Sequence, residues 1–241
     1  MIESFEKTKL AGSIASGALD EVNNIIKPGI STVEIDKLCY QFINDHKAFS
    51  APLYYRGFPK SCCTSANHVV CHGIPSDKIL NEGDIINVDV TALKDEWHGD
   101  TSRMFAVGEC SVKAKKLIKV TYEAMMRAIK IIKANVKMGN IGYEIQNTVE
   151  AEGFSVVRDF CGHGIGKKFH ESPNVLHYGE KNTGKPLKPG MIFTVEPMIN
   201  SGDFETKTLK DGWTAVTKDK SLSAQFEHTV GVTKEGYEIF T

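Results

Sequence analysis

The chain has 241 residues, 41% of them hydrophobic, so it is long enough to bury a substantial core and to form one large domain or two small ones. Its 29 basic and 30 acidic residues leave a formal net charge of -1, which excludes an overall electrostatic attraction to nucleic acid or to an anionic membrane. The sequence has no signal-peptide apolar core and no run near the ~18 apolar residues of a membrane span, so we expect a cytoplasmic protein.

Three segments have the apolar periodicity of amphipathic helices, and they cover residues 3–26, 32–47 and 111–134. The second has the clearest start signal, because Ser31 and Glu34 have the spacing of a capping box just before its apolar positions. We therefore expect helices that each bury one face against another element.

Four runs rich in apolar and β-branched residues are typical of strands, and they cover residues 84–93, 97–107, 191–199 and 223–232. Helices and mostly antiparallel strands are thus mixed along the chain, which predicts an α+β fold. No linker or low-complexity segment interrupts the sequence. We therefore expect a single domain spanning residues 1–241.

The first two strand-like runs predict a hairpin that carries two acids where apolar residues dominate. With Lys94 and Asp95 as its two loop residues, Asp89 would lie directly opposite Asp100. Two carboxylates that close together repel each other, and burying them is costly unless they are protonated or bound to cations.

Three short segments recur in the same order in the two halves of the chain. "IIKPGISTVEI" (25–35) resembles "NVKMGNIGYEI" (135–145), "CHGI" (71–74) resembles "GHGI" (162–165), and "LNEGDIINVDV" (80–90) resembles "LKPGMIFTVEP" (187–197). In the last pair an acid stands six residues after a glycine both times, Asp89 after Gly83 and Glu196 after Gly190. Chance could produce any one of these matches, but three in order favour duplication. Asp89 and Glu196 would then occupy matching places near a cleft between related halves.

Five side chains are candidate metal ligands: Asp89, Asp100, His163, Glu196 and Glu227. Any one of these acids alone would more often be a surface or salt-bridged residue, and a lone histidine would more often be a partly buried hydrogen-bonding group. Together, four carboxylates match the charge of two divalent cations. Without a thiolate, the set favours Mn²⁺, Fe²⁺, Co²⁺ or Zn²⁺. A mononuclear oxygenase site with two histidines and one carboxylate is the alternative, but carboxylates outnumber histidines here.

The six cysteines form no C-x-x-C pair, and six in a chain of this length do not make a disulfide scaffold. We therefore expect reduced thiols. The glycines around His163, which are Gly162, Gly164 and Gly166, could serve turns.

Five motifs, in order between residues 70 and 230, resemble those of the methionine aminopeptidases. They are "VCHGIP", "NVDVTALKDEWHGDTSR", "CGHGIGKKFHE", "TVEPM" and "QFEHTV". The resemblance implies the α+β pita-bread fold, with two halves related by a pseudo-twofold axis, that creatinase also adopts. The short span from His170 to Glu196 and the short segment before the first motif resemble the type I branch, in its bacterial or organellar form.

The resemblance also implies roles for particular residues. Two divalent ions (Co, Mn, Fe or Zn) would be held by Asp89, Asp100, His163, Glu196 and Glu227. Glu196 would also accept a proton from the attacking water, while His72 and His170 would contact the substrate beside the metals. The pocket for the methionine side chain would be lined by Tyr55, Phe58, Cys63, Phe169 and Trp213. Related sequences often have histidine in place of Arg56 and tyrosine in place of Phe58.

The implied activity is removal of the initiator methionine from nascent proteins whose second residue is small, by a monomer that contacts the ribosome transiently. Two alternatives stay open at this stage. A prolidase or Xaa-Pro aminopeptidase shares the fold and the metal ligands, but it usually carries an N-terminal domain for which residues 1–60 leave no room. A non-catalytic binding module of the same fold would typically have lost metal ligands.

Overall fold

The computed structural model describes residues 2–241, and its α-helices begin close to where the sequence predicts them. They are α1 (Ile2–Ile25), α2 (Thr32–Asp45), α3 (Val112–Lys130) and α4 (Gly139–Ala151), with a short 3-10 helix η1 (Tyr55–Gly57). The capping box of α2 is confirmed, because the Ser31 hydroxyl accepts from the Glu34 backbone N–H and the Glu34 carboxylate accepts from the Ser31 N–H. The sequence analysis misses α4, whose first turn contains two helix-weakening glycines, Gly139 and Gly142.

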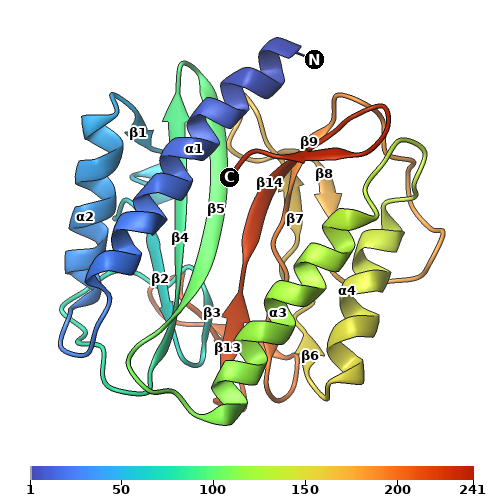
Figure 1. Cartoon of the computed structure of the whole chain (residues 1–241). Helices are drawn as coiled ribbons and strands as arrows, with labels where there is room; N and C mark the ends of the chain where they lie inside the picture. Colours follow the sequence, from blue (N-terminus) through green and yellow to red (C-terminus); the bar gives the residue numbers. More distant parts are fainter. Residues whose placement is uncertain (1) are drawn as a thin grey trace.

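A nine-stranded sheet forms the centre of the molecule (Figure 1). Its main path runs β1 (Phe49–Ser50), β4 (Ile85–Lys94), β5 (Trp97–Ala106), β14 (Glu227–Val232), β9 (Ile192–Val195), β7 (Gly162–Gly164) and β8 (Glu171–Val175). Strand β2 (Cys63–Ala66) also pairs with β4, and β15 (Tyr237–Ile239) also pairs with β14. All pairs are antiparallel, so the α+β class predicted from the sequence is confirmed.

Two three-stranded sheets complete the fold, and the sequence predicts only part of them because their strands are short. One joins β6 (Ser155–Val156), β10 (Met198–Asn200) and β13 (Ser223–Gln225). The other joins β3 (Val69–Cys71), β11 (Thr206–Thr208) and β12 (Ala215–Thr217). The predicted runs 191–199 and 223–232 are therefore each split into two strands that belong to different sheets.

The β4–β5 hairpin forms as expected, but its register differs from the prediction. Lys94 pairs with Trp97, so Asp95 and Glu96 are the loop residues, and both have positive φ (47° and 70°) as a tight type I′ turn requires. Asp89 consequently pairs with Ser102, and Asp100 pairs with Thr91. The prediction that the two acids are directly opposite is wrong. They are instead diagonal neighbours on the same face of the sheet, still within reach of a shared ligand.

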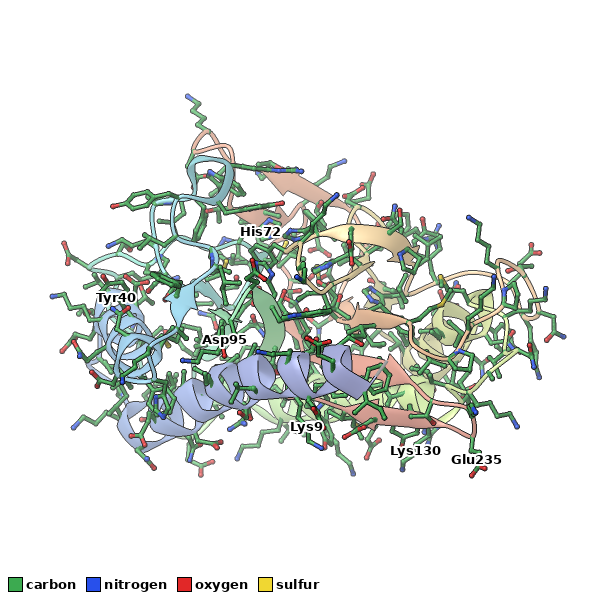
Figure 2. The ribbon with its side chains drawn as sticks, turned by 90° about the horizontal axis from the view of Figure 1, so that it is seen from above. Lys9, Tyr40, His72, Asp95, Lys130 and Glu235 are labelled. Carbon is green, nitrogen blue, oxygen red and sulfur yellow. The ribbon has the colours of Figure 1, made fainter. Side chains whose placement is uncertain are left out.

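The four helices cover one face of the central sheet (Figure 1). Helices α1 and α2 bury a core against β4 and β5 that includes Ile86 and Val88, while α3 and α4 bury a second core that includes Phe193 and Val230. Seen from above, α1 runs along one side of the strands and His72 lies on the other (Figure 2). Since side chains alternate along a strand, Val88 faces the helices and Asp89 faces away from them.

The duplication inferred from the sequence is visible in matching backbone hydrogen bonds. Gly83 N–H donates to Val107 O at 2.8 Å, and Gly190 N–H donates to Val232 O at 2.8 Å. The turn before α2 and the turn before α4 also match, because Leu80 N–H donates to Ile30 O and Leu187 N–H donates to Val136 O, both at 2.8 Å. In this hydrogen bonding, residue 136 is the counterpart of residue 30. The alignment of the sequence strings instead makes residue 140 the counterpart, which is four residues later.

Among residues 2–241, none of the helices combines the length and the apolar character that a membrane span requires. All six cysteines are unbonded thiols, and five of them are buried, as the sequence analysis expects.

Candidate metal centre

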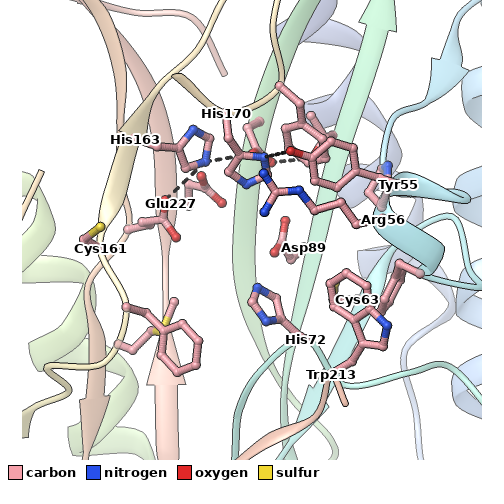
Figure 3. A pocket seen from close by; sticks show the side chains of 18 of the residues that line it. Tyr55, Arg56, Cys63, His72, Asp89, Cys161, His163, His170, Trp213 and Glu227 are labelled. Carbon is pink, nitrogen blue, oxygen red and sulfur yellow. Dashed lines mark hydrogen bonds and ion pairs between the residues drawn. The ribbon is translucent and has the colours of Figure 1, made fainter. Parts of the chain in front are cut away.

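Five adjacent strands of the central sheet each contribute one of the predicted ligands. In order across the sheet, β4 carries Asp89, β5 carries Asp100, β14 begins with Glu227, β9 leads directly into Glu196, and β7 carries His163. Segments far apart in the sequence therefore meet at one place, on the face that the helices leave uncovered (Figure 3).

The side-chain atoms lie at distances that suit a shared cation. His163 Nε2 is 3.7 Å from Asp100 Oδ2 and 3.6 Å from Glu196 Oε1, too far for direct hydrogen bonds. One ligand atom each from Asp100, His163 and Glu227 lies within 4.8 Å of the other two. When two ligand atoms each stand about 2.0–2.2 Å from one ion, the distance between the two atoms is similar to the separations observed here.

Neighbouring polar groups orient two of the acids. Thr91 Oγ1 donates to Asp100 Oδ1 at 2.7 Å, and Thr194 Oγ1 donates to Glu196 Oε1 at 2.6 Å. Gln225 Nε2 lies 3.4 Å from the other Glu196 oxygen. The sequence analysis misses these partners, although Thr91 and Thr194 stand two positions from an acid and so share its face of the strand.

The four carboxylates are electrostatically unfavourable without a cation. Burial raises the pKa of Asp89 to about 7 and that of Glu196 to about 8. Burial and repulsion from neighbouring carboxylates raise the pKa of Asp100 and Glu227 well above their usual range. Among the described residues, Glu227 Oε1 is buried and has no hydrogen-bond partner. A buried carboxylate oxygen with no donor fits a divalent cation bound in this cluster.

The histidines beside the acids are kept neutral. Burial lowers the pKa of His163 to about 4, and burial together with the charge of His163 lowers that of His170 to about 3. Burial also lowers the pKa of His72. A neutral imidazole suits metal ligation at His163 and hydrogen bonding at the other two. His170 Nδ1 lies 3.1 Å from the Tyr55 hydroxyl, so if Tyr55 donates, the His170 proton stands on Nε2.

The glycines that flank His163 are explained by close packing and not by turns. Gly162 and Gly164 lie in β7, where a Cβ atom would stand 2.3 Å from Thr194 O and 2.2 Å from Ser172 O respectively. Only glycine lets β7 approach its two neighbours this closely. The interpretation that these two glycines serve turns is therefore wrong, and their packing role fixes the strand that presents His163.

The cluster opens into a cavity of about 580 Å³. Every residue that the sequence analysis places in the site lines this cavity, namely Tyr55, Phe58, Cys63, His72, Asp89, Asp100, His163, Phe169, His170, Glu196, Trp213 and Glu227. One wall is apolar, with Phe58 and Trp213 in an edge-to-face contact at 5.2 Å between ring centroids. Phe160, whose ring lies 5.5 Å from that of His72, and Met198 extend the wall, and the sequence analysis misses both. Met198 closes the quoted "TVEPM" motif, which was the available signal.

The sequence and the fold are similar to those of methionine aminopeptidases. The sequence matches the family described as Metallopeptidase family M24 over residues 6–234. The methionine aminopeptidase of Rickettsia prowazekii is 56% identical over 240 residues, which cover 99% of this chain and 93% of that protein. The crystal structure of methionine aminopeptidase from Rickettsia prowazekii matches with a TM-score of 0.99 at 55% identity, over 100% of this chain and 98% of that chain.

Peptidases of another specificity share the architecture less closely. The crystal structure of X-Pro aminopeptidase from Thermotoga maritima matches with a TM-score of 0.78 at 25% identity, over 100% of this chain but only 61% of that chain. The pita-bread architecture expected from the sequence is thereby confirmed. The Xaa-Pro alternative is not favoured, and neither is a non-catalytic module, since no candidate ligand is missing from the cavity.

Proposed function

The chain belongs to metallopeptidase family M24, and we propose that it is a methionine aminopeptidase of the bacterial type I form. Its reaction would be hydrolysis of the peptide bond after the initiator methionine of nascent proteins. The observation that carries the proposal is the cavity itself, where three buried carboxylates, the half-buried Asp89 and a neutral imidazole lie beside an apolar wall.

The acid cluster would hold two divalent cations of Mn, Fe, Co or Zn, with Asp89, Asp100, His163, Glu196 and Glu227 as ligands. The charge of four carboxylates supports two ions. The buried Glu227 Oε1, which has no hydrogen-bond partner among the described residues, supports metal ligation by this acid. When bound, such ions supply a water molecule activated for attack and a Lewis acid for the scissile carbonyl.

The chain's own groups would manage the protons and the developing charge. Glu196 would accept a proton from the attacking water, a role supported by the position of its carboxylate in the cavity, 3.6 Å from His163 Nε2. Neutral His170 would donate from Nε2 to the oxyanion of the tetrahedral intermediate, held in place by the Tyr55 hydroxyl at Nδ1. His72 would hold the scissile amide from the opposite side of the acids (Figure 3).

The apolar wall would set the preference for methionine. Phe58 and Trp213 form an edge-to-face pair, Cys63 lies beside them, and Tyr55 contacts Phe169 at 4.8 Å between ring centroids. An unbranched, polarizable thioether packs well against aromatic rings and sulfur. The acid cluster adjoins this wall, which leaves little room for the residue that follows methionine.

A series of peptides that differ in their second residue tests this function. Peptides that begin Met-Ala, Met-Gly or Met-Ser should be cleaved, while those that begin Met-Lys, Met-Phe or Leu-Ala should be refused or nearly so, as kcat/KM measured with Mn²⁺- or Co²⁺-loaded protein would show. Norleucine should be cleaved slowly in place of methionine, since an apolar pocket discriminates such a change by only ~1–3 kcal/mol. Equal kcat/KM for Met-Ala and Met-Phe would indicate a general aminopeptidase, and faster cleavage of Xaa-Pro peptides would indicate a prolidase-like enzyme.

Replacement of His170 by alanine separates catalysis from metal binding. His170→Ala should lower kcat by roughly 10²-fold, the usual cost of losing an oxyanion donor, while the bound metal stays nearly unchanged. Kinetics and metal analysis of the same preparation give both quantities. If the variant lost as much metal as a variant of a carboxylate ligand does, His170 would be a ligand and its proposed role would be wrong.

The proposal extends to the setting of the reaction. Residues 1–241 would act as one catalytic domain, because the candidate ligands come from both duplicated halves. The enzyme would work as a cytoplasmic monomer and contact the ribosome transiently, where nascent N-termini emerge. Size-exclusion chromatography and co-sedimentation with ribosomes are the corresponding measurements.

A further inference from the structure

Arg56 gives the cavity a charge opposite to that of its other charged residues. Among residues 2–241 it is the only lysine or arginine that lines the cavity. The acids on the wall are Asp89, Asp100, Asp159, Glu171, Glu196 and Glu227. Its side chain is exposed, and Figure 3 shows it reaching across the mouth toward His170.

The backbone at Arg56 is in a conformation that arginine rarely adopts. Its φ is 48°, and two nearby residues of the same loop also have positive φ, Tyr54 at 64° and Gly57 at 89°. Glycine or asparagine takes up the left-handed region at lower cost. Strained backbone of this kind persists where a particular side chain is needed, and it clusters at ligand sites. The conformation aims Arg56 into the cavity at some cost to the loop.

The guanidinium group is held at the mouth without a neutralising partner. Its Cζ atom lies 5.4 Å from the centroid of the Tyr55 ring, whose hydroxyl contacts His170. Within residues 2–241, no acid forms an ion pair with Arg56.

We propose that Arg56 is a specificity-determining residue that favours substrates with an acidic side chain at the third position. This inference rests on the proposed function, which puts methionine against Phe58 and Trp213 and the second residue between the two histidines. Each extended residue spans about 3.3–3.6 Å, and in this binding mode the third residue extends away from the acid cluster toward the mouth, where Arg56 lies. Once cations neutralise the buried carboxylates, the charges left there are those of Arg56, Asp159 and Glu171.

Three amidated peptides that differ only in charge test the proposal: Met-Ala-Asp, Met-Ala-Asn and Met-Ala-Lys. The amide removes the C-terminal carboxylate, so the third side chain carries the only variable charge. At low salt, the wild-type protein should show a kcat/KM for the Asp peptide about three- to fivefold above that for the Lys peptide, the ratio expected for an exposed ion pair. The ratio should shrink as salt screens the interaction.

Substitutions assign the preference to this side chain. Arg56→Asn suits the left-handed backbone and should bring the Asp-to-Lys ratio to one or below, because Asp159 and Glu171 then remain. Arg56→Lys should keep most of the preference, and Arg56→Gly offers a second neutral variant should the asparagine variant fold poorly. Lys168→Ala is the matched control, since Lys168 is exposed two residues before His170 but lies outside the cavity lining.

Binding gives a readout that does not depend on turnover. Reduced-amide analogues of the Asp and Lys peptides can be titrated by calorimetry. The wild-type protein should bind the Asp analogue more tightly than the Lys analogue, and this difference should disappear in Arg56→Asn. If wild-type protein cleaves none of the three peptides, the proposed function fails. If it cleaves all three but the Asp-to-Lys ratio is equal in wild type and Arg56→Asn, or if wild type prefers lysine, the role of Arg56 is overturned while the proposed function stands.

Discussion

Asp100→Asn should lose bound metal and, with it, turnover on a Met-Ala peptide by about 10³-fold or more, the scale of losing a component of the catalytic unit. Asp100 is 4% exposed, and its carboxylate lies close to both His163 and Glu227. An amide has the same shape but no charge, so it removes one unit of the negative charge that the cations must balance. Metal analysis after dialysis against metal-free buffer measures the first effect, and kcat/KM measures the second.

Asp159→Asn is the matched control for this experiment. Asp159 lines the same cavity, but it is exposed and accepts a hydrogen bond from Thr206 outside the acid cluster. It should keep the full metal content. Undiminished metal in Asp100→Asn, or full turnover by a rigorously metal-free wild-type preparation, would contradict the proposed centre.

Local sequence signals predict those parts of the fold that local interactions decide. Helices α1, α2 and α3 begin within one residue of their predicted starts, and the β4–β5 hairpin forms where alternation and turn residues indicate. The hairpin loop is misplaced by one residue, because backbone dihedral angles and not composition decide which two residues turn. The smallest strands, such as β6 and β11, are missed because a run of two or three residues carries no periodicity.

The candidate site is predictable to the extent that its chemistry is visible in the chain. Acids on apolar strands, such as Asp89 and Glu227, contradict the burial pattern and so stand out. The side chains that orient the acids stand out less, and some of them come from distant segments. Gln225 lies near Glu196, and His177 Nε2 accepts from the Glu196 backbone N–H at 3.1 Å, contacts that only the folded sheet creates. The sequence thus predicts the candidate metal ligands better than the side chains that orient them.

The metal-free protein should lose stability as the pH rises through neutrality. Burial raises the pKa of Asp89 to about 7 and that of Glu196 to about 8, and burial together with repulsion from neighbouring carboxylates raises the pKa of Asp100 and Glu227 well above their usual range. A carboxyl group whose pKa is higher in the folded state than in the unfolded state contributes stability while it is protonated. That contribution is complete below the unfolded-state pKa of about 4, and it is lost as the pH rises through the folded-state value.

Histidines whose pKa is lowered in the folded state act in the opposite direction, but at lower pH. The folded-state pKa of His163 is lowered to about 4 and that of His170 to about 3, so their contribution is present above the usual histidine pKa and lost only in acid. Near pH 6.5 histidines of the unfolded chain still bind protons and oppose the slope, whereas above about pH 7.5 the histidines are neutral in both states and the carboxylates dominate. Buried thiols such as Cys63, whose pKa is also raised, stay protonated in the folded state, while thiols of the unfolded chain begin to ionise near pH 8.5 and add to the fall.

Urea unfolding with a chelator at about pH 7.5, 8.0 and 8.5 should therefore show the free energy of unfolding falling by a few kcal/mol, since each pH unit changes it by about 1.4 kcal/mol per carboxylate that remains protonated only in the folded state. Metal-loaded protein should show little of this slope, because the cations hold the same carboxylates ionised. Glu227→Gln supplies the internal comparison: its amide neither ionises nor needs to take up a proton to be buried, so at about pH 8.5 the metal-free variant should be more stable than metal-free wild type, although it binds metal poorly. A flat pH profile of the metal-free wild type, or a Glu227→Gln variant less stable than wild type under chelation, would mean that the carboxylates are not the strained, cation-dependent cluster described above.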